Sequence, residues 1–294
     1  MRAGDSATSG RLAIIAGGGL LPHYLADAAR RHGENPLIIQ LADEPAPEWS
    51  GFDIGHASVG DFSSIRRLFS AYGISRVVLS GSVRRRPEWR QIRPTFGFLA
   101  QVPFVLKTLR RGGDNAVLEM VIRLLEALGC KVIGAHEIAP DLLATPGPVG
   151  SCKPDAEARE DMRVAIDAAL QLGRLDIGQG AVAVGGRIVA LEGPEGTDAM
   201  LARVAEMRES GRISSRRKGV LVKLAKPQQD ERADLPAIGL DTVKNAARAG
   251  LAGIVGEAGR SLILDRSELA FAADAAGLFV YGVELDRPAQ VEAK

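Results

Sequence analysis

The feature that most constrains the fold is a short apolar run that ends in three consecutive glycines. Residues 12–16 read LAIIA, residues 17–19 are the glycines, and a helical pattern covers residues 20–31. Glycines directly after a buried strand allow a tight turn and a close approach of the backbone to a ligand. The next segments with a clear pattern are a strand at 36–41, a helix at 62–72 and a strand at 76–80. This alternation predicts a parallel sheet covered by helices.

The first half continues with helical patterns at 98–111 and 116–128 and a strand at 130–134. Composition then changes at residues 144–154, ATPGPVGSCKP, where prolines and glycines discourage regular structure. We therefore predict a Rossmann-like parallel-sheet domain and a second α/β domain with a mixed sheet, joined by a linker. The predicted boundaries are a disordered leader at 1–10, the N-terminal domain at 11–145, the linker at 146–155 and the C-terminal catalytic domain at 156–287.

The second half also alternates between helices and strands. A helix is predicted at 156–172, and strands at 182–184 and 187–191 form a hairpin through the Gly-Gly pair between them. Thr197 is expected to cap the helix that follows. The later segments are predicted as strand 219–224, helix 241–249, strands 253–255 and 262–264, helix 269–276 and strand 278–283.

Composition excludes several classes of protein. The 294 residues are 46% hydrophobic and 25% charged with a net charge of +1, so we exclude wholesale disorder and a general affinity for nucleic acid. The sequence contains no run of eighteen apolar residues, so no membrane span is predicted. We interpret the chain as cytoplasmic. Two cysteines and four scattered histidines favour neither a disulfide framework nor a zinc site. A hard cation held by carboxylates stays open.

The glycine loop is the first candidate site. Glycines before a helix suit a phosphate, but the dinucleotide fingerprint needs a glycine where this chain has Pro22. Gln40 also stands near the end of the second strand in place of an acidic residue, so a nicotinamide site is disfavoured. Contact with another phosphate or nucleotide and a merely tight turn remain alternatives. The second candidate is residues 81–90, GSVRRRPEWR, a strand end with three arginines that is either a ligand site or a solvated basic loop.

The third candidate is the stretch from Gly178 to Asp198. Polar side chains lie at the ends of its two short strands and at a helix start, and they are Gln179, Glu192, Glu195, Thr197 and Asp198. Glu192 directly follows an apolar strand and is either a strand-end ligand or part of a solvated loop. Asp198 in the first helical turn is also a favourable partner of the helix dipole.

The fourth candidate, residues 219–239, carries most weight. Alternation along GVLVKL places Lys223 on the face of Leu221, and a lysine among apolar side chains is costly unless it meets an anion. Lys226 follows, and then Asp230 and Asp234 lie in a proline-flanked segment. Cations beside two carboxylates are what metal-assisted phosphoryl chemistry requires, because carboxylates hold Mg²⁺ and lysines neutralise phosphate oxygens. The alternative is a surface loop whose charges pair with one another.

Several long motifs occur together in one order. They are IAGGGLLP at 15–22, GSVRR near 81, GGDNAVL at 112–118, DIGQG at 176–180, ALEGPEGTDAML at 190–201 and VLVKLAKPQQDERADLPAIGLDTV at 220–243. In these motifs, and in the final stretch GRSLILDRSELAFAADAAGLFVYG, the chain resembles the UDP-2,3-diacylglucosamine pyrophosphatases of lipid A biosynthesis, of the LpxI type. The resemblance covers nearly the whole chain, from Arg11 to about Leu285.

The resemblance implies a two-domain enzyme that binds its substrate between the domains. It would hydrolyse the pyrophosphate of UDP-2,3-diacylglucosamine to UMP and 2,3-diacylglucosamine 1-phosphate with a divalent cation, Mg²⁺. It also implies a homodimer, and it leaves open peripheral contact with the inner face of the inner membrane.

Combining the resemblance with the residues, we assign Asp234 and Asp230 to metal binding and water orientation, with Lys223 as a catalytic cation. The predicted substrate-binding residues are Gly17, Gly18, Gly19, Leu20, Ser82, Gln179, Glu192, Thr197, Asp198, Lys226 and Gln229. An apolar cluster is assigned to the acyl chains or to ordinary core, and it comprises Phe96, Phe98, Leu99, Val102, Phe104 and Val105. A nucleotide-sugar transferase, an NAD-linked enzyme and a non-catalytic lipid or nucleotide sensor stay open as alternatives.

Overall fold

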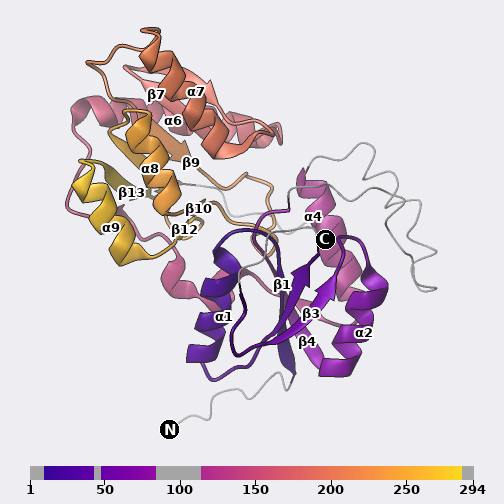
Figure 1. Cartoon of the computed structure of the whole chain (residues 1–294). Helices are drawn as coiled ribbons and strands as arrows, with labels where there is room; N and C mark the ends of the chain where they lie inside the picture. Colours follow the sequence, from indigo (N-terminus) through magenta and orange to yellow (C-terminus); the bar gives the residue numbers. More distant parts are fainter. Residues whose placement is uncertain (1–9, 43–47, 84–113, 287–294) are drawn as a thin grey trace. The chain divides into compact units, whose positions relative to one another are not determined.

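The structure, a computed structural model, describes residues 10–42, 48–83 and 114–286 (Figure 1). The chain forms two compact units. The first comprises the chain up to Asp141 together with Gln229–Asp234, and the second comprises Leu142–Gln228 and the chain from Leu235 onward. The predicted linker, residues 146–155, therefore belongs to the second unit, and a short piece of the predicted C-terminal domain belongs to the first. The predicted helix at 98–111, the arginines at 84–86 and the apolar cluster at 96–105 lie outside the described residues.

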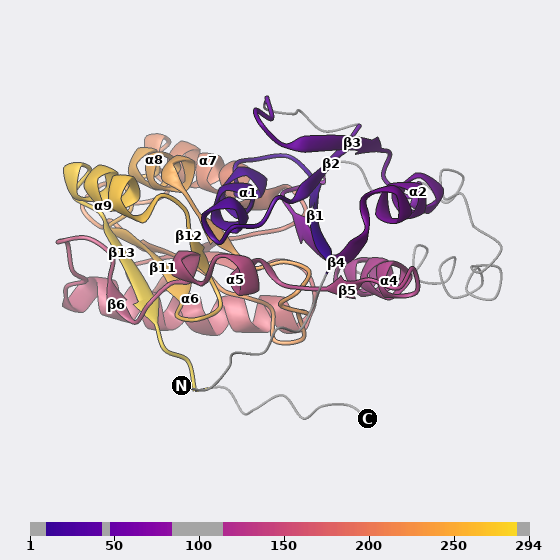
Figure 2. The same cartoon turned by 90° about the horizontal axis from the view of Figure 1, so that it is seen from below.

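The first unit has a parallel sheet of the Rossmann type, as predicted. Its strands are β1 (Arg11–Ala16), β2 (Leu37–Leu41), β3 (Asp53–Ala57), β4 (Ile74–Ser80) and β5 (Lys131–Val132), in the spatial order β3-β2-β1-β4-β5. Its helices are α1 (Leu21–Arg31), α2 (Phe62–Tyr72), α4 (Asp114–Glu126) and the short α5 (Ala135–Ile138). Helix α1 covers one face of the sheet, and α2 and α4 cover the other (Figures 1 and 2).

Alternation along the strands builds the core of the first unit. Ala13 and Ile15 of β1 point to the side of α2 and α4, where they join a buried cluster with Phe69 and Leu125. Strand β3, DIGHA, was not predicted from the sequence, because it lies at the sheet edge and its residues are mostly exposed. An edge strand needs no continuous apolar run, and so it gives a weak sequence signal.

The second unit has a mixed sheet, also as predicted. Its strands are β6 (Gly147–Pro148), β7 (Gly180–Val184), β8 (Arg187–Leu191), β9 (Val220–Lys223), β11 (Gly253–Glu257) and β13 (Phe279–Val283), in the spatial order β6-β13-β11-β9-β7-β8. Strands β9, β11 and β13 are parallel, whereas β7 runs antiparallel to both β8 and β9. A separate parallel pair consists of β10 (Ala237–Ile238) and β12 (Leu262–Ile263). The helices are a 3-10 turn (Pro140–Leu142) at the junction of the units, α6 (Ala156–Arg174), α7 (Gly196–Glu209), α8 (Leu240–Arg248) and α9 (Arg266–Ala275).

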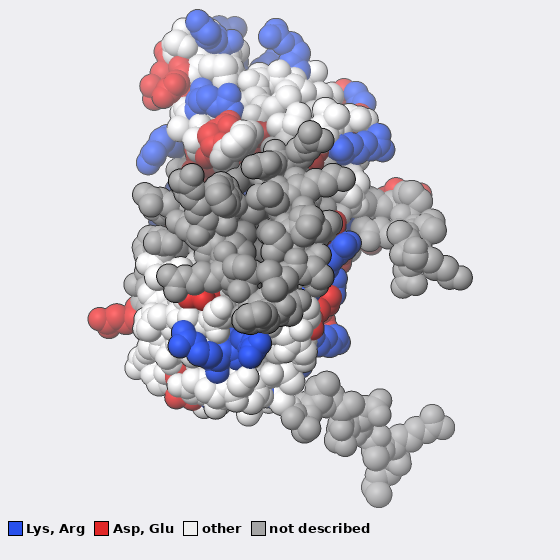
Figure 3. Space-filling model, turned by 90° about the vertical axis from the view of Figure 1, so that its right-hand side faces the viewer, with Lys and Arg blue, Asp and Glu red and all other residues white. Residues whose placement is uncertain are grey.

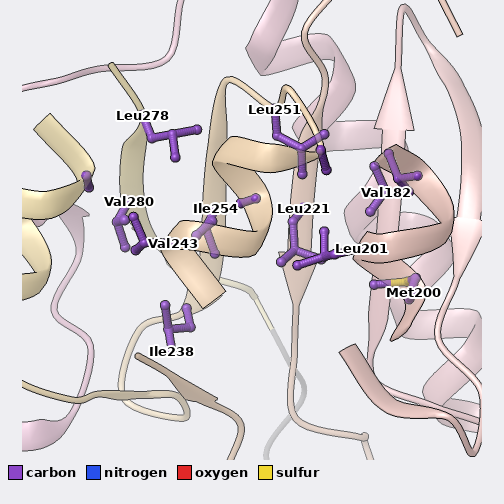
Figure 4. Packing of buried hydrophobic residues seen from close by; sticks show 14 of the residues in the cluster. Val182, Met200, Leu201, Leu221, Ile238, Val243, Leu251, Ile254, Leu278 and Val280 are labelled. Atoms are coloured by element: carbon purple, nitrogen blue, oxygen red, sulfur yellow. The ribbon is translucent and has the colours of Figure 1, made fainter. Parts of the chain in front are cut away.

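The mixed sheet is buried on both faces. On one face Leu221 of β9 and Ile254 of β11 pack with side chains of α7, α8 and α9, including Leu201 and Val243 (Figure 4). On the other face the alternate residues of the same strands pack against α6. Burial on both sides explains the nearly continuous apolar runs of these strands and makes the sheet a rigid support for the polar residues at its edge.

Residues within the predicted linker, 146–155, are anchored to the second unit. Residues 147–148 form β6 and pair with β13, and the Asp274 carboxylate accepts hydrogen bonds from the backbone amides of Ser151 and Cys152. These backbone hydrogen bonds hold the pKa of Asp274 below its ordinary value. Prolines and glycines in this stretch exclude a helix, but they do not prevent pairing at a sheet edge.

The hairpin between β7 and β8 turns where the sequence predicted it. Gly185 and Gly186 both have positive φ, 59° and 74°, as a two-residue hairpin turn requires. The buried carboxylate of Asp161 on α6 accepts hydrogen bonds from both turn amides, at 3.1 Å from Gly185 N and 2.6 Å from Gly186 N. Asp161 thus fastens the hairpin to the helix that covers it.

We expect Asp161→Ala to lower the free energy of unfolding by about 1–3 kcal/mol, because it leaves two partly buried turn amides without their acceptor. Asp167→Ala on the exposed side of α6 is the matched control and should change stability by less than about 0.5 kcal/mol. Urea unfolding at neutral pH measures both, and equal effects of the two variants would contradict the role given to Asp161.

No helix within the described residues is long and apolar enough to cross a bilayer. On the face shown in Figure 3, basic and acidic side chains are interspersed over the described surface, in keeping with the net charge of +1.

Candidate functional site

The glycine loop of the first unit lies at the point where the strand order reverses. Strand β1 has β2 on one side and β4 on the other, and ligands of open α/β sheets bind beyond the strand ends at such a point. Here the loop is tied to the end of β4. Gly17 N donates to Ser80 O at 2.8 Å, and Gly18 and Ser82 exchange two backbone hydrogen bonds of 2.8 Å each.

This pairing explains Gly17 without a phosphate. A Cβ at Gly17 would collide with the carbonyl oxygen of Ser82, and the Gly17 and Gly18 amides already donate to carbonyl groups. Gly19 has φ 94°, and the exposed Leu20 then precedes the first turn of α1. Pro22 stands in that turn, where its missing N–H costs nothing. The tight-turn interpretation therefore accounts for Gly17, and substrate binding by this loop and by Ser82 stays a prediction.

Four sequence segments of the second unit meet at one edge of its sheet. Lys223 at the end of β9 is paired with Gly180 of β7 and with Gly256 of β11. Gln179 O accepts from Leu224 N at 2.9 Å, and Gly180 O accepts from Glu192 N at 2.9 Å. Strands β8, β9 and β11 all end at this edge, and β7 begins there. Residues that are far apart in the sequence thus gather at these strand ends. We call this group the polar edge, and it comprises Gln179, Glu192, Thr197, Lys223, Lys226 and Glu257.

Glu192 is the buried centre of the polar edge. Its side chain is 6% exposed, and it accepts hydrogen bonds from Thr197 Oγ1 at 2.7 Å and from Gln179 N at 3.2 Å. A Cβ at Gly180 would stand 2.8 Å from Glu192 Oε2, and one at Gly178 would collide with the Glu192 carbonyl. Gly180 therefore makes room for this carboxylate, and Gly178 makes room for the backbone carbonyl of Glu192.

The prediction that Thr197 caps a helix is wrong. Helix α7 begins at Gly196 with Glu195 as its N-cap, so Thr197 lies inside the first turn and does not cap the helix. Its hydroxyl donates to Glu192 instead. Asp198 is directed elsewhere, because it accepts from Asn245 Nδ2 of α8 at 2.9 Å. The structure thus brings Gln179, Glu192 and Thr197 together and gives Asp198 a separate helix-to-helix contact.

Lys223 lies on the face of Leu221, as the alternation predicted, and it is partly buried. Its Nζ donates to the carbonyl oxygen of Ala237 at 3.0 Å. Among the described residues no carboxylate forms an ion pair with it. A partly buried ammonium group that is oriented by a carbonyl and not neutralised is a site for an anion.

Lys226 has a different environment. Its Nζ lies 2.6 Å from Asp176 Oδ1, and the two side chains are 11% and 23% exposed. Asp176 has a left-handed backbone, with φ 54°, at the end of α6. Sequence reasoning quoted Asp176 in a motif but gave it no role. The two residues are 50 positions apart in the sequence, and so the pair was not predictable from local sequence patterns.

The two candidate metal ligands, Asp230 and Asp234, lie in the segment Gln229–Asp234, which belongs to the first unit. Arg232 approaches Asp230 with Nε at 3.0 Å from Oδ1 and with Nη2 at 2.7 Å from Oδ2, and its Nη1 lies 2.8 Å from Glu126 Oε1 of α4. Burial would raise the pKa of Asp230, but the hydrogen bonds from Arg232 outweigh it and hold this pKa below its ordinary value. Asp234 is exposed, and its Oδ2 accepts from the buried Gln229 at 3.3 Å.

These contacts test the fit of a divalent cation. Both oxygens of Asp230 are engaged by Arg232, which leaves little capacity for a metal. Asp234 fits better, because Mg²⁺ in phosphate chemistry is often held by one or two carboxylates together with water and the substrate. Within the described ranges no three His, Cys, Asp or Glu side chains gather as a ready-made metal site. The predicted carboxylates belong to the first unit and the predicted lysines to the second, and their meeting in one site stays a prediction.

A further polar pair at the polar edge was missed from the sequence. Glu257 ends β11 and is 3% exposed, with Arg260 Nη1 at 3.8 Å from its Oε1. Its backbone amide donates to Ser261 Oγ at 2.9 Å. A signal was available in the sequence, because Glu257 comes shortly after the apolar residues of a predicted strand, with Gly256 between them.

Fold and site define a two-unit α/β protein, with a Rossmann-type sheet in one unit and a polar strand-end edge in the other. Residues 11–142 match the LpxI N-terminal domain, and residues 145–281 match the LpxI C-terminal domain. The chain therefore belongs to the LpxI family. It is 43% identical over 278 residues to the UDP-2,3-diacylglucosamine pyrophosphatase LpxI of Caulobacter vibrioides. The aligned region covers 93% of this chain and 98% of the relative.

The solved structures that match the chain are distant in sequence and score low in structural similarity. The Bordetella bronchiseptica enzyme WbmG in complex with NAD is 19% identical, covers 44% of this chain and 37% of its own, and gives a TM-score of 0.27. The Thermus thermophilus UDP-glucose 4-epimerase complex with NAD is 14% identical, covers 93% of this chain and 86% of its own, and gives a TM-score of 0.28. At such scores the likeness supports no conclusion about a ligand.

We expect Thr197→Val to lower the free energy of unfolding by about 1–3 kcal/mol, because the buried Glu192 carboxylate loses its hydroxyl donor. Thr197→Ser keeps the hydroxyl and should stay within about 1 kcal/mol of the parent protein. Chemical unfolding followed by circular dichroism compares the two. If valine is tolerated as well as serine, the hydrogen bond to Glu192 does not stabilise the polar edge.

Proposed function

We propose that the protein hydrolyses the pyrophosphate bond of UDP-2,3-diacylglucosamine, giving UMP and 2,3-diacylglucosamine 1-phosphate in lipid A biosynthesis. The observation that carries this proposal is the 43% identity, over 93% of the chain, to a relative named for that activity. Matches to both domains of the LpxI family support it. The described side chains can then be given roles.

Lys223 is the first cation for the substrate. Water attack on a phosphoanhydride builds negative charge on the phosphoryl oxygens, and a fixed positive charge stabilises the transition state more than the ground state. Lys223 has such a charge, because its Nζ is held by the Ala237 carbonyl and is not neutralised by a carboxylate of the described chain. The rigid sheet below it limits the reorganisation that binding would need.

Lys226 is the second cation, with a weaker net field. Asp176 orients its ammonium group at 2.6 Å and at the same time offsets part of its charge. A phosphate oxygen can share this ammonium group, because a lysine has three donors. We therefore assign Lys226 to substrate binding and Lys223 to catalysis.

Asp234 is the carboxylate best placed for the water or for a cation. It is exposed, and Gln229 restricts its side chain through a hydrogen bond of 3.3 Å. When bound, Mg²⁺ would supply positive charge to the phosphate oxygens and polarise a water molecule, and Asp234 would hold it. Asp230 has the supporting role, since its oxygens accept from Arg232.

The remaining predicted residues complete the proposal. Gln179, Glu192 and Thr197 form a hydrogen-bonded group that would contact the sugar or the diphosphate. The turn at residues 17–20 and Ser82 would contact the uridine or diphosphate side. We further propose a homodimer that works in the cytoplasm with at most peripheral contact with the inner membrane. The absence of a membrane-spanning helix among the described residues supports the last part only.

Release of UMP from UDP-2,3-diacylglucosamine tests the proposal. With Mg²⁺ we expect steady release by the parent protein, and with excess chelator we expect little, because the charge that Mg²⁺ would supply is then absent. Asp234→Asn keeps the shape and the hydrogen bond from Gln229 but removes the charge, so we expect at least a roughly hundredfold loss of kcat.

Glu231→Gln changes a carboxylate in the same segment that has no assigned role, and it should retain the parent rate. Chromatography of the products separates release of UMP from simple binding. A folded parent protein that binds the substrate and releases no UMP would refute the enzyme and favour a lipid or nucleotide sensor.

A further inference from the structure

The segment Gln229–Asp234 lies in sequence between β9 and β10 of the second unit, yet it is part of the first. Ala233 is 8% exposed and belongs to the buried cluster of the first unit. The backbone of Glu231 passes close to Gly134, where an added Cβ would stand 3.2 Å from the Glu231 carbonyl oxygen. The segment is therefore docked along its length, and it presents Asp234 from a fixed base.

Arg232 makes the polar contacts of this docking. Its Nε and Nη2 atoms bind both oxygens of Asp230, and its Nη1 reaches Glu126 Oε1 at 2.8 Å. Asp230 in turn accepts from Arg232 N at 3.0 Å, and its carbonyl accepts from Ala233 N at 2.9 Å. One guanidinium group thus closes the turn internally and joins it to α4, which is more than a hundred residues away in sequence.

The position of Glu126 explains why a positively charged side chain is favourable at residue 232. Glu126 is the last residue of α4, where the helix dipole disfavours a negative charge. Arg232 offsets that charge and meets Asp230 with its planar fork, a geometry that lysine cannot reproduce. Because two of its nitrogen atoms serve Asp230 and the third serves Glu126, Arg232 is arranged to hold protein groups rather than a ligand.

We propose that Arg232, anchored by Glu126, is a positioning residue that fixes the turn carrying Asp234 for the hydrolytic step. This inference rests on the proposed function of Asp234. It adds two residues, one of them on a helix of the first unit, to which neither sequence reasoning nor the comparisons give a role.

Two single variants and their combination test the proposal. Arg232→Gln should lower kcat by roughly tenfold to a hundredfold with KM within about threefold, because a displaced turn misplaces Asp234 without removing substrate contacts. Glu126→Gln should give a smaller loss of roughly threefold to tenfold, since Arg232 still binds Asp230. The double variant should match Arg232→Gln alone, because Glu126 acts through Arg232.

Hydrogen exchange of the peptide that contains residues 229–234 gives a readout independent of activity. The amides of Arg232 and Ala233, which are bonded to Asp230, should exchange faster in both single variants. Arg163→Gln removes an exposed ion pair on α6 and serves as the control that leaves both exchange and kcat unchanged. Arg232→Lys should restore only part of the lost kcat and protection.

The outcomes separate this inference from the proposed function. If the parent protein releases UMP and faster exchange leaves kcat unchanged, positioning by Arg232 is refuted while the function stands. A loss confined to KM would also refute positioning, and it would indicate that Arg232 contacts the substrate. If the parent protein releases no UMP, the proposed function fails, whereas the exchange data still decide whether Arg232 and Glu126 fix the turn.

Discussion

The proposed chemistry depends on one partly buried positive charge at the end of a central strand. Lys223 is held there by a carbonyl 3.0 Å away and is flanked by Gly180 and Gly256 on the neighbouring strands. Because the sheet is buried on both faces, the backbone that carries this lysine has a fixed place in the fold. The buried carboxylate of Glu192 accepts hydrogen bonds from neutral groups, a backbone amide and a hydroxyl. It therefore does not neutralise the charge of Lys223.

The second constraint is the path of the chain between the units. The motif KPQQDERAD is continuous in sequence, but its lysine lies in the second unit and both of its aspartates lie in the first. Arg232 and Ala233 supply the docking that makes this path stable, one through ion pairs and the other through burial. A continuous motif therefore serves two folded bodies, and its charged residues have separate local environments.

Strong local signals predicted much of this structure. The strand-glycine-helix start, the Gly185-Gly186 hairpin and the position of Lys223 follow from alternation and turn chemistry, which act over a few residues. Contacts between distant segments were not predictable. Strand β3 has no apolar run, Thr197 donates to Glu192 instead of capping a helix, and Asp176 meets Lys226 across the fold. Gln179 and Glu192 stand next to strands β7 and β8, and Thr197 lies in the first turn of the helix that follows, so the three residues meet through hydrogen bonds. Their role in substrate binding stays a prediction.

The measurement that we would make is kcat/KM for UMP release by Lys223→Met, beside Lys226→Met and the exposed control Lys244→Met. The unneutralised charge of Lys223 predicts a loss of roughly 10²–10³-fold, a smaller loss for Lys226→Met and parent activity for Lys244→Met. A folded Lys223→Met protein that stays within about threefold of the parent kcat/KM would contradict the assignment of the phosphate to this strand end.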